Sequence, residues 1–317
     1  MRTLICGLIL VSIATGVSAQ FFTDAFNYGT GPTIGTWTEA KGNWSAVANQ
    51  AEAEQVFAWQ YATQPLMMYK DCACQCDVIY NKASSQALQF GGVAIRANGA
   101  ANDTNTVMCK FQDNNSNGQF DRLYIYDRPG GSTWADPTTP TTKGTVRLLA
   151  IDKRLVCQLD TDGDGLWDLV VNRTSTQTPV AGPIAIDGFG GAFIDNFALF
   201  EAVLLPDTAN TSPIPGSAQK YVMRGNANEA FQAALSFGNT GIPVGPAGTI
   251  PLSFDPLLVA SLNFPGFSGT LDANGDGDFT VNIPNAGILV GLTYYTGFVT
   301  INAGISGISN DHQETIV

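Results

Sequence analysis

Four aspartates crowd into the stretch 160–168 of the sequence, where they alternate with glycines: Asp160, Asp162, Asp164 and Asp168. Carboxylates this close repel one another unless a cation lies among them. Their spacing matches the first, third, fifth and ninth positions of an acidic calcium loop. Gly165 takes the sharp-turn position of that loop, and Leu166 would offer its carbonyl oxygen at the next one. The sequence therefore predicts Ca²⁺ as a cofactor.

The last ligand of the calcium-loop pattern is missing, because Val171 stands where a bidentate glutamate is expected. Such a loss predicts weak binding, of the kind seen in extracellular modules. The alternative is a metal-free hairpin turn, since Asp-Gly between alternating strands is a strong hairpin signal. A second acidic stretch, 272–278, contains Asn-Gly and Asp-Gly and favours the hairpin interpretation.

The elements that would position these residues are strands. Only 13% of the residues are charged, 34 are glycine, and short runs rich in Val, Thr, Ile and aromatic residues lie between turn-forming clusters, as in an all-β protein. Within the runs, apolar and other residues alternate with a period of two, which predicts one core-facing side per strand. The predicted core side includes Val93, Ile95, Val107, Cys109, Phe111, Leu123 and Ile125.

The opposite side of the same runs combines hydrogen-bonding and aromatic groups. In a curved sheet, neighbouring strands would gather them on one concave surface. A sugar ring requires polar partners for its hydroxyls and a flat apolar plate for its CH face. The alternative is an ordinary solvated sheet face on which such side chains pair across strands. The candidate ligand-binding residues are Arg96, Lys110, Gln112, Arg122, Tyr124 and Tyr126.

The order of the motifs resembles a known architecture. An opening DAF at 24–26 is followed by a GNWS turn, an FGG strand, an FDRLYIY strand, a hairpin with an acidic tip and a closing IDNFAL strand. This order resembles the concanavalin A-like, laminin G-like jelly roll of secreted bacterial proteins, over residues 21 to about 203. The resemblance implies a sandwich of the lectin class, and we expect this domain to span residues 20–203.

A second domain is expected to follow a linker. Residues 204–219 are rich in Pro, Ser and Thr, and their prolines cannot join a central ladder. From residue 220 to 317, phrases such as FSGTLDANGDG and LVGLTYYTGFV resemble a small C-terminal β-sandwich found in secreted environmental bacterial proteins. That resemblance implies a fold and no activity.

The first residues predict export. Arg2 precedes an apolar run that ends at small residues suited to cleavage after Ala19, so residues 1–19 have the form of a signal peptide. This run is short for a membrane span, and no later segment has the required length. We therefore expect a secreted protein, located extracellularly or at the cell surface.

Composition also excludes several functions. With 15 Lys plus Arg against 27 Asp plus Glu, the net charge of −12 makes nucleic acid an unsuitable partner. The single histidine, His312, provides neither a catalytic triad nor a histidine metal site. Paired carboxylates on one strand, as a glycoside hydrolase needs, are not evident in the sequence, although a separated aspartate pair stays possible.

Five cysteines remain after signal cleavage: Cys72, Cys74, Cys76, Cys109 and Cys157. Their odd number leaves at least one thiol unpaired within a chain. The three at 72–76 would share one strand face and are unsuited to pairing with one another. Since Cys109 and Cys157 fall on the apolar sides of their own strands, all five are expected in one core, where a bridge from the triplet to either is one option.

Together these observations predict a secreted, non-enzymatic, calcium-stabilised, lectin-like protein that recognises extracellular polysaccharide or a cell-surface partner. Two alternatives stay open. The first is a structural or adhesive matrix component with no small ligand, and the second is a glycoside hydrolase. The sequence specifies neither the glycan nor the oligomeric state.

Overall fold

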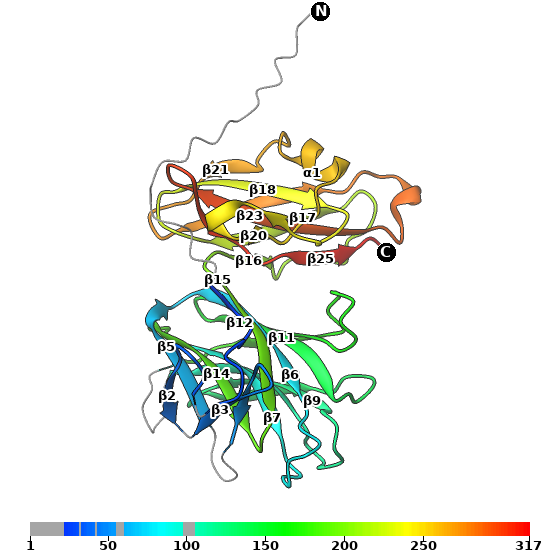
Figure 1. Ribbon diagram of the computed structural model, residues 1–317. Coiled ribbons are helices and arrows are strands. Elements are labelled where there is room, and N and C mark those ends of the chain that lie inside the picture. The colour runs from blue at the N-terminus through cyan, green and yellow to red at the C-terminus, as the bar shows by residue number, and fades with distance from the viewer. Residues whose placement is uncertain (1–21, 32, 42, 55–59, 98–104) are drawn as a thin grey trace, which may run out of the picture.

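The computed structural model describes residues 22–31, 33–41, 43–54, 60–97 and 105–317 (Figure 1). The predicted signal peptide, residues 1–19, lies outside the described residues. Strands form most of the described chain, and they build two sandwiches, one lying above the other in Figure 1. The predicted all-β fold class is confirmed.

The N-terminal domain contains two antiparallel sheets. The eight-stranded sheet has the order β13 (Leu169–Thr174), β12 (Arg154–Asp160), β11 (Lys143–Ile151), β6 (Cys72–Ile79), β15 (Phe193–Phe200), β4 (Gln50–Ala53) and β3 (Trp44–Val47), and β1 (Phe22–Asp24) also pairs with β15. The seven-stranded sheet has the order β10 (Gly131–Ala135), β9 (Arg122–Asp127), β8 (Val107–Gln112), β7 (Phe90–Ile95), β14 (Gly182–Phe189), β5 (Gln60–Tyr69) and β2 (Thr38–Lys41). Two such sheets packed face to face form a β-sandwich, as the resemblance implied.

The core between these sheets follows the period-two pattern. Every residue predicted for the core side is buried there, including Val93, Phe111 and Ile125, each fully shielded from solvent. Alternation succeeds as a predictor because successive side chains of a strand point to opposite faces of its sheet.

All five cysteines lie in this core, as predicted. Cys109 on β8 and Cys157 on β12 form a disulfide that joins the two sheets. A bridge from the 72–76 triplet, which the sequence left as an option, is not formed. Cys72, Cys74 and Cys76 stay reduced, and burial raises the pKa of all three thiols.

The C-terminal domain is a smaller sandwich. Its three-stranded sheet has the order β16 (Val203–Pro206), β17 (Ala218–Arg224) and β22 (Asp276–Asn282). Its five-stranded sheet has the order β21 (Ser268–Thr270), β18 (Ala230–Ser236), β23 (Thr293–Ile301) and β24 (Ile305–Ile308), with β25 (His312–Thr315) also pairing with β23. A two-stranded ribbon of β19 (Ile242–Pro243) and β20 (Thr249–Ile250), a helix α1 (Pro256–Ser261) and two short 3₁₀ turns, η1 (Gly245–Ala247) and η2 (Gly287–Leu289), complete it.

The start of the expected linker belongs to this second sandwich instead. Residues 203–206 form β16, and Leu204 and Leu205 are buried. Pro206 is compatible with a strand because β16 lies at the edge of its sheet, where a missing N–H breaks no central ladder. The chain therefore passes almost directly from one sandwich to the other, from Phe200 at the end of β15 to Val203 at the start of β16.

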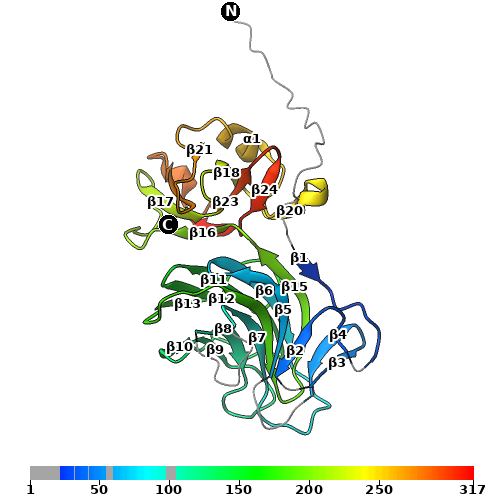
Figure 2. The same cartoon turned by 90° about the vertical axis from the view of Figure 1, so that its left-hand side faces the viewer.

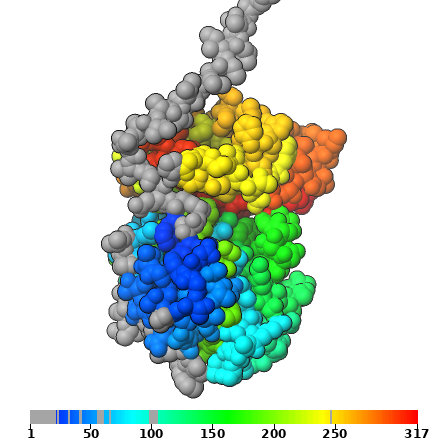
Figure 3. Space-filling view, in the orientation of Figure 1, coloured from blue at the N-terminus to red at the C-terminus, as the bar shows by residue number. Residues whose placement is uncertain are grey.

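The domains meet across the outer face of the eight-stranded sheet (Figure 2). Leu149 and Val156 on that face pack with Val203, Leu205 and partly buried Val222 in one apolar cluster. Each sandwich thus covers part of the other, and the space-filling view shows them in contact (Figure 3).

Two sets of ion pairs flank this apolar cluster. On one side, the Arg224 guanidinium lies 2.8 Å from the carboxylate of Asp152 and 3.4 Å from that of Asp71. On the other, Arg147 pairs with Asp311 at 2.8 Å, and both side chains are almost fully buried. These contacts fix the relative position of the domains. Among the described residues, no helix has the length and apolar character needed to cross a membrane.

Candidate functional site

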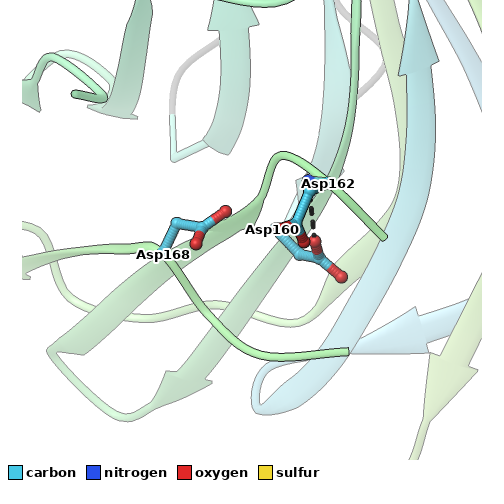
Figure 4. Close-up of side chains that lie close together, drawn as sticks. All are labelled: Asp160, Asp162 and Asp168. Carbon is cyan, nitrogen blue, oxygen red and sulfur yellow. Dashed lines mark hydrogen bonds between the residues drawn. The ribbon is translucent and has the colours of Figure 1, made fainter. Parts of the chain in front are cut away.

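The acidic loop lies between β12 and β13, at the edge of the eight-stranded sheet. Oxygens of Asp160, Asp162 and Asp168 lie within 4.8 Å of one another (Figure 4). Asp164 is not a member of this group. The structure therefore brings together three of the four predicted aspartates.

Backbone N–H groups of the loop explain this arrangement. The carboxylate of Asp160 accepts hydrogen bonds from Gly163 (2.7 Å) and Gly165 (3.0 Å). The carboxylate of Asp168 accepts the backbone N–H of Thr161 at 2.8 Å and also its hydroxyl. These bonds fold the loop back on itself and bring the three carboxylates together.

Asp164 is held differently, because one of its oxygens accepts the N–H of Leu166 at 2.8 Å. This bond occupies the N–H of Leu166 and leaves its carbonyl oxygen, the predicted ligand, unaffected, so the roles of Asp164 and Leu166 stay predictions. What remains is an oxygen-only group of three carboxylates, which suits a hard cation such as Ca²⁺. Burial raises the pKa of Asp160, although the backbone N–H groups oppose that rise, so a bound cation would relieve the desolvation of its charge.

The loop also contacts the second domain. Leu166 packs against a cluster there that includes Ala234, Leu258 and Tyr295. Beside it, Trp167 stacks on the guanidinium of Arg147, with the ring centroid 4.3 Å from Cζ. The acidic loop is thus anchored between the two sandwiches.

Most of the predicted ligand-binding residues lie together on the outer face of the seven-stranded sheet. In the ladder between β8 and β9, Lys110 lies opposite Tyr124 and Gln112 lies opposite Arg122. Tyr126 lies one pair further along the same face, opposite Met108. Antiparallel pairing of β8 with β9 therefore gathers these residues as expected.

Strand β10 adds Trp134, which pairs with Tyr124 and whose surface is 53% exposed. The ring centroids of Tyr124 and Tyr126 lie 5.3 Å apart, and those of Tyr124 and Trp134 lie 6.1 Å apart. We call Tyr124, Tyr126 and Trp134 the aromatic shelf. Trp134 and the partly exposed Tyr126 offer ring surface to a ligand, whereas Tyr124 is 8% exposed and supports both by packing.

A rigid polar pair borders the aromatic shelf. Arg122 donates to both carboxylate oxygens of Asp136, at 2.6 and 2.9 Å, and its guanidinium lies 5.5 Å from the Trp134 ring centroid. The hydrogen bonds from Arg122 lower the pKa of Asp136. Because the pair is bidentate, it presents charged groups in a fixed orientation beside the exposed ring.

Sequence reasoning missed Trp134 and Asp136. The signal was present in the run GSTWAD, which begins at a glycine turn and carries an aromatic residue and a carboxylate two positions apart. Residues two apart share a strand face. The sequence does not show that this strand pairs with β9, and it is this pairing that brings Trp134 next to Tyr124.

Lys110 does not reach the surface, contrary to expectation. It is 1% exposed, and its Nζ lies 3.8 Å from the Phe90 ring centroid and 4.3 Å from that of Tyr126. These rings cover the ammonium, so Lys110 supports the aromatic shelf from below. Burial lowers its pKa to about 8, with nearby Asp187 opposing the change and Arg128 adding to it.

This buried amine predicts a pH-dependent stability. Its folded pKa of about 8 lies below the ordinary 10.5, so the unfolded chain binds more protons between those values, and stability rises as pH increases through that window. Relative to Lys110→Met, wild type should gain up to about 3 kcal/mol between pH 8 and 10.5. Urea unfolding of both proteins at several pH values measures the difference. A constant difference would contradict the assignment.

Arg96 belongs to the domain boundary and not to this surface. It is 3% exposed, its Nε donates to the carbonyl oxygen of Lys70 at 2.6 Å, and its Nη2 donates to that of Asp152 at 2.5 Å. It has a positive φ of 56°, which turns the chain at the end of β7 and directs it away from the face that alternation predicted. Arg96 therefore ties two hairpin turns together.

Comparisons with known proteins concern the fold alone. No protein-family model and no curated protein sequence matches the chain. Among solved structures, a carbohydrate-binding module of Bacillus subtilis shares 14% identity at a TM-score of 0.40 and covers 51% of this chain and 93% of its own. A β-glucanase of Bacillus licheniformis shares 11% identity at 0.39 (59% and 98% covered), and lectin II of Ulex europaeus shares 11% at 0.38 (57% and 98%). At these values the similarities carry no argument about function, which rests on the chain's own residues.

Proposed function

We propose that this protein is an extracellular carbohydrate-binding protein that recognises polysaccharide through the aromatic shelf, with Ca²⁺ stabilising the acidic loop. The observation that carries the proposal is the exposed ring of Trp134 beside the Arg122–Asp136 pair. The ring supplies an apolar plate for the CH face of a sugar. The fixed guanidinium and carboxylate supply a donor and an acceptor for its hydroxyl groups.

The shape of the surface favours a chain over a small molecule. Tyr126 on β9 and Trp134 on β10 each pack against the buried Tyr124, so the accessible ring surface is spread along the sheet. Successive sugar units of one polysaccharide chain would lie along this surface. Lys110 is covered by the rings, and the charge of Arg122 is paired with that of Asp136, which suits a neutral sugar.

A glycan array with a matched pair of variants tests the aromatic shelf. Trp134→Ala should weaken binding by about thirtyfold or more, because an exposed aromatic anchor at the centre of a contact typically contributes at least ~2 kcal/mol. Phe254→Ala is the control, since Phe254 is 79% exposed but lies in the second domain. If wild type retains no glycan at any calcium concentration, the protein is better described as a matrix component without a sugar ligand.

Calcium should raise the thermal stability. At tenfold above its dissociation constant, one bound ion adds about 1.4 kcal/mol, equivalent to about 2 to 4 °C in the melting temperature. Melting curves in calcium and in chelator measure this shift. Asp162→Asn should abolish the shift, whereas Asp278→Asn, which removes an exposed carboxylate outside the loop, should preserve it. Equal melting temperatures in calcium and chelator would contradict a calcium site.

A further inference from the structure

A cavity of about 370 Å³ lies at the boundary of the two domains, on the opposite sheet from the aromatic shelf. Its floor is the outer face of the eight-stranded sheet, where β6 and β11 place Asp77 beside Thr145 and Gln75 beside Arg147. The second domain contributes Asn239. The first domain forms most of the cavity, and the second closes one side of it with Asn239.

We propose that this cavity is a second carbohydrate site, which takes one neutral sugar unit; the proposal rests on the proposed function and extends it. The volume lies at the small end of the range for small-molecule pockets. The cavity is thus suited to a short ligand, in contrast to the ring surface spread along the other sheet.

The lining supplies both kinds of hydrogen-bonding group that a hydroxyl requires. Lys143 and Asn239 are donors, and Asp162 is an acceptor at the rim. Trp167 adds a half-buried ring, held in place by the Arg147 guanidinium on which it stacks. A ring wall with convergent donors and acceptors matches the mixed surface of a sugar.

Existing contacts hold the floor in place before any ligand binds. Oδ1 of Asp77 accepts from the Thr145 hydroxyl at 2.6 Å, and its Oδ2 accepts from Asn196 at 2.9 Å. Arg147 donates to the Gln75 side chain at 2.9 Å and forms its ion pair with Asp311. A site fixed in this way loses little conformational entropy on binding.

The balance of charge selects a neutral ligand. The lining has three carboxylates, on Asp77, Asp160 and Asp162, against two cations, on Lys143 and Arg147. Because Arg147 already faces Asp311, its charge is not available to a further anion. With Ca²⁺ on the acidic loop, the charges of Asp160 and Asp162 are offset as well, which leaves Asp77 against Lys143. Phosphates and acidic sugars therefore gain no net attraction here, whereas uncharged hydroxyl groups meet donors and acceptors side by side.

The test compares the cavity with the aromatic shelf in the full chain at constant calcium. Binding is measured by ligand-observed NMR, and the probes are the methyl glycosides of glucose, galactose, mannose, xylose and N-acetylglucosamine. The cavity variant is Lys143→Ala with Asn239→Ala, and Lys143→Ala alone is a milder form that alters only an exposed residue. Lys153→Ala with Asn263→Ala is the matched control, because both residues are exposed and lie outside the cavity.

We expect at least one glycoside to bind with the same affinity to wild type, to the control variant and to Trp134→Ala. The cavity variant should bind that glycoside at least about tenfold more weakly, because it lacks two hydrogen bonds. Glycoside binding that Trp134→Ala abolishes and the cavity variant retains would overturn the inference while supporting the aromatic shelf. Polysaccharide binding by wild type with no glycoside bound would overturn it as well. Binding of neither overturns both proposals.

Discussion

Replacing Arg147 by alanine is expected to lower the free energy of unfolding by about 3 to 5 kcal/mol, because it leaves a buried carboxylate without its cation. Asp311 is 2% exposed and lies 2.8 Å from the guanidinium. The same guanidinium also stacks on Trp167 and holds Gln75. Urea unfolding measures the loss, and small-angle X-ray scattering shows whether the domains separate.

The matched control is an exposed ion pair in the same chain. Lys220 and Asp278 lie 3.2 Å apart but are roughly half exposed, so Lys220→Ala should change stability by less than about 1 kcal/mol. A double variant, Arg147→Ala with Asp311→Ala, should lose less than the sum of the single losses, since it removes both buried charges. An Arg147→Ala protein as stable as Lys220→Ala would show that this ion pair does not hold the domains together.

Removal of the disulfide is expected to have a similar effect. Cys109 and Cys157 are separated by 48 positions, and closing a loop of that length stabilises the folded state by about 4 kcal/mol in the chain-entropy description. The bond also joins β8 to β12 across the core, and therefore links the sheet that carries the aromatic shelf to the sheet that carries the acidic loop. The double variant Cys109→Ala with Cys157→Ala should thus unfold at a lower urea concentration.

Reductant supplies an independent measurement. Dithiothreitol should lower the stability of wild type toward that of the double variant and leave the double variant unchanged, because the other three cysteines are already thiols. Cys74→Ala is the control, since it alters a buried cysteine in the same core without affecting the bond. If wild type has the same stability with and without dithiothreitol, the disulfide contributes nothing measurable.

The sequence and the structure agree best where the argument depends on one strand at a time. Alternation assigned Val93, Phe111 and Ile125 to the core, and the same alternation grouped Arg122, Tyr124 and Tyr126 on one face. Side-chain direction within a strand follows from backbone geometry alone, with a period of two. The turns could also be predicted from the sequence, because Asp-Gly pairs between alternating runs mark a chain reversal.

The predictions that failed concern residues whose environment comes from a distant part of the chain. Lys110 alternates onto the outer face as expected, yet rings from β7 and β9 bury it. Arg96 continues the same pattern but adopts a positive φ and turns to the domain boundary. In each case a local pattern was overridden by packing or by a hydrogen bond.

By itself, the sequence determined the all-β class, the core faces of the strands, the acidic loop and the burial of all five cysteines, since each depends on periodicity or spacing along a single segment. The tertiary structure alone decided that Cys109 pairs with Cys157, that Trp134 joins Tyr124, and that Arg147 and Asn239 meet across a cavity between two domains. These contacts join segments far apart in the chain. Their geometry follows from strand order and domain docking, which no local pattern encodes.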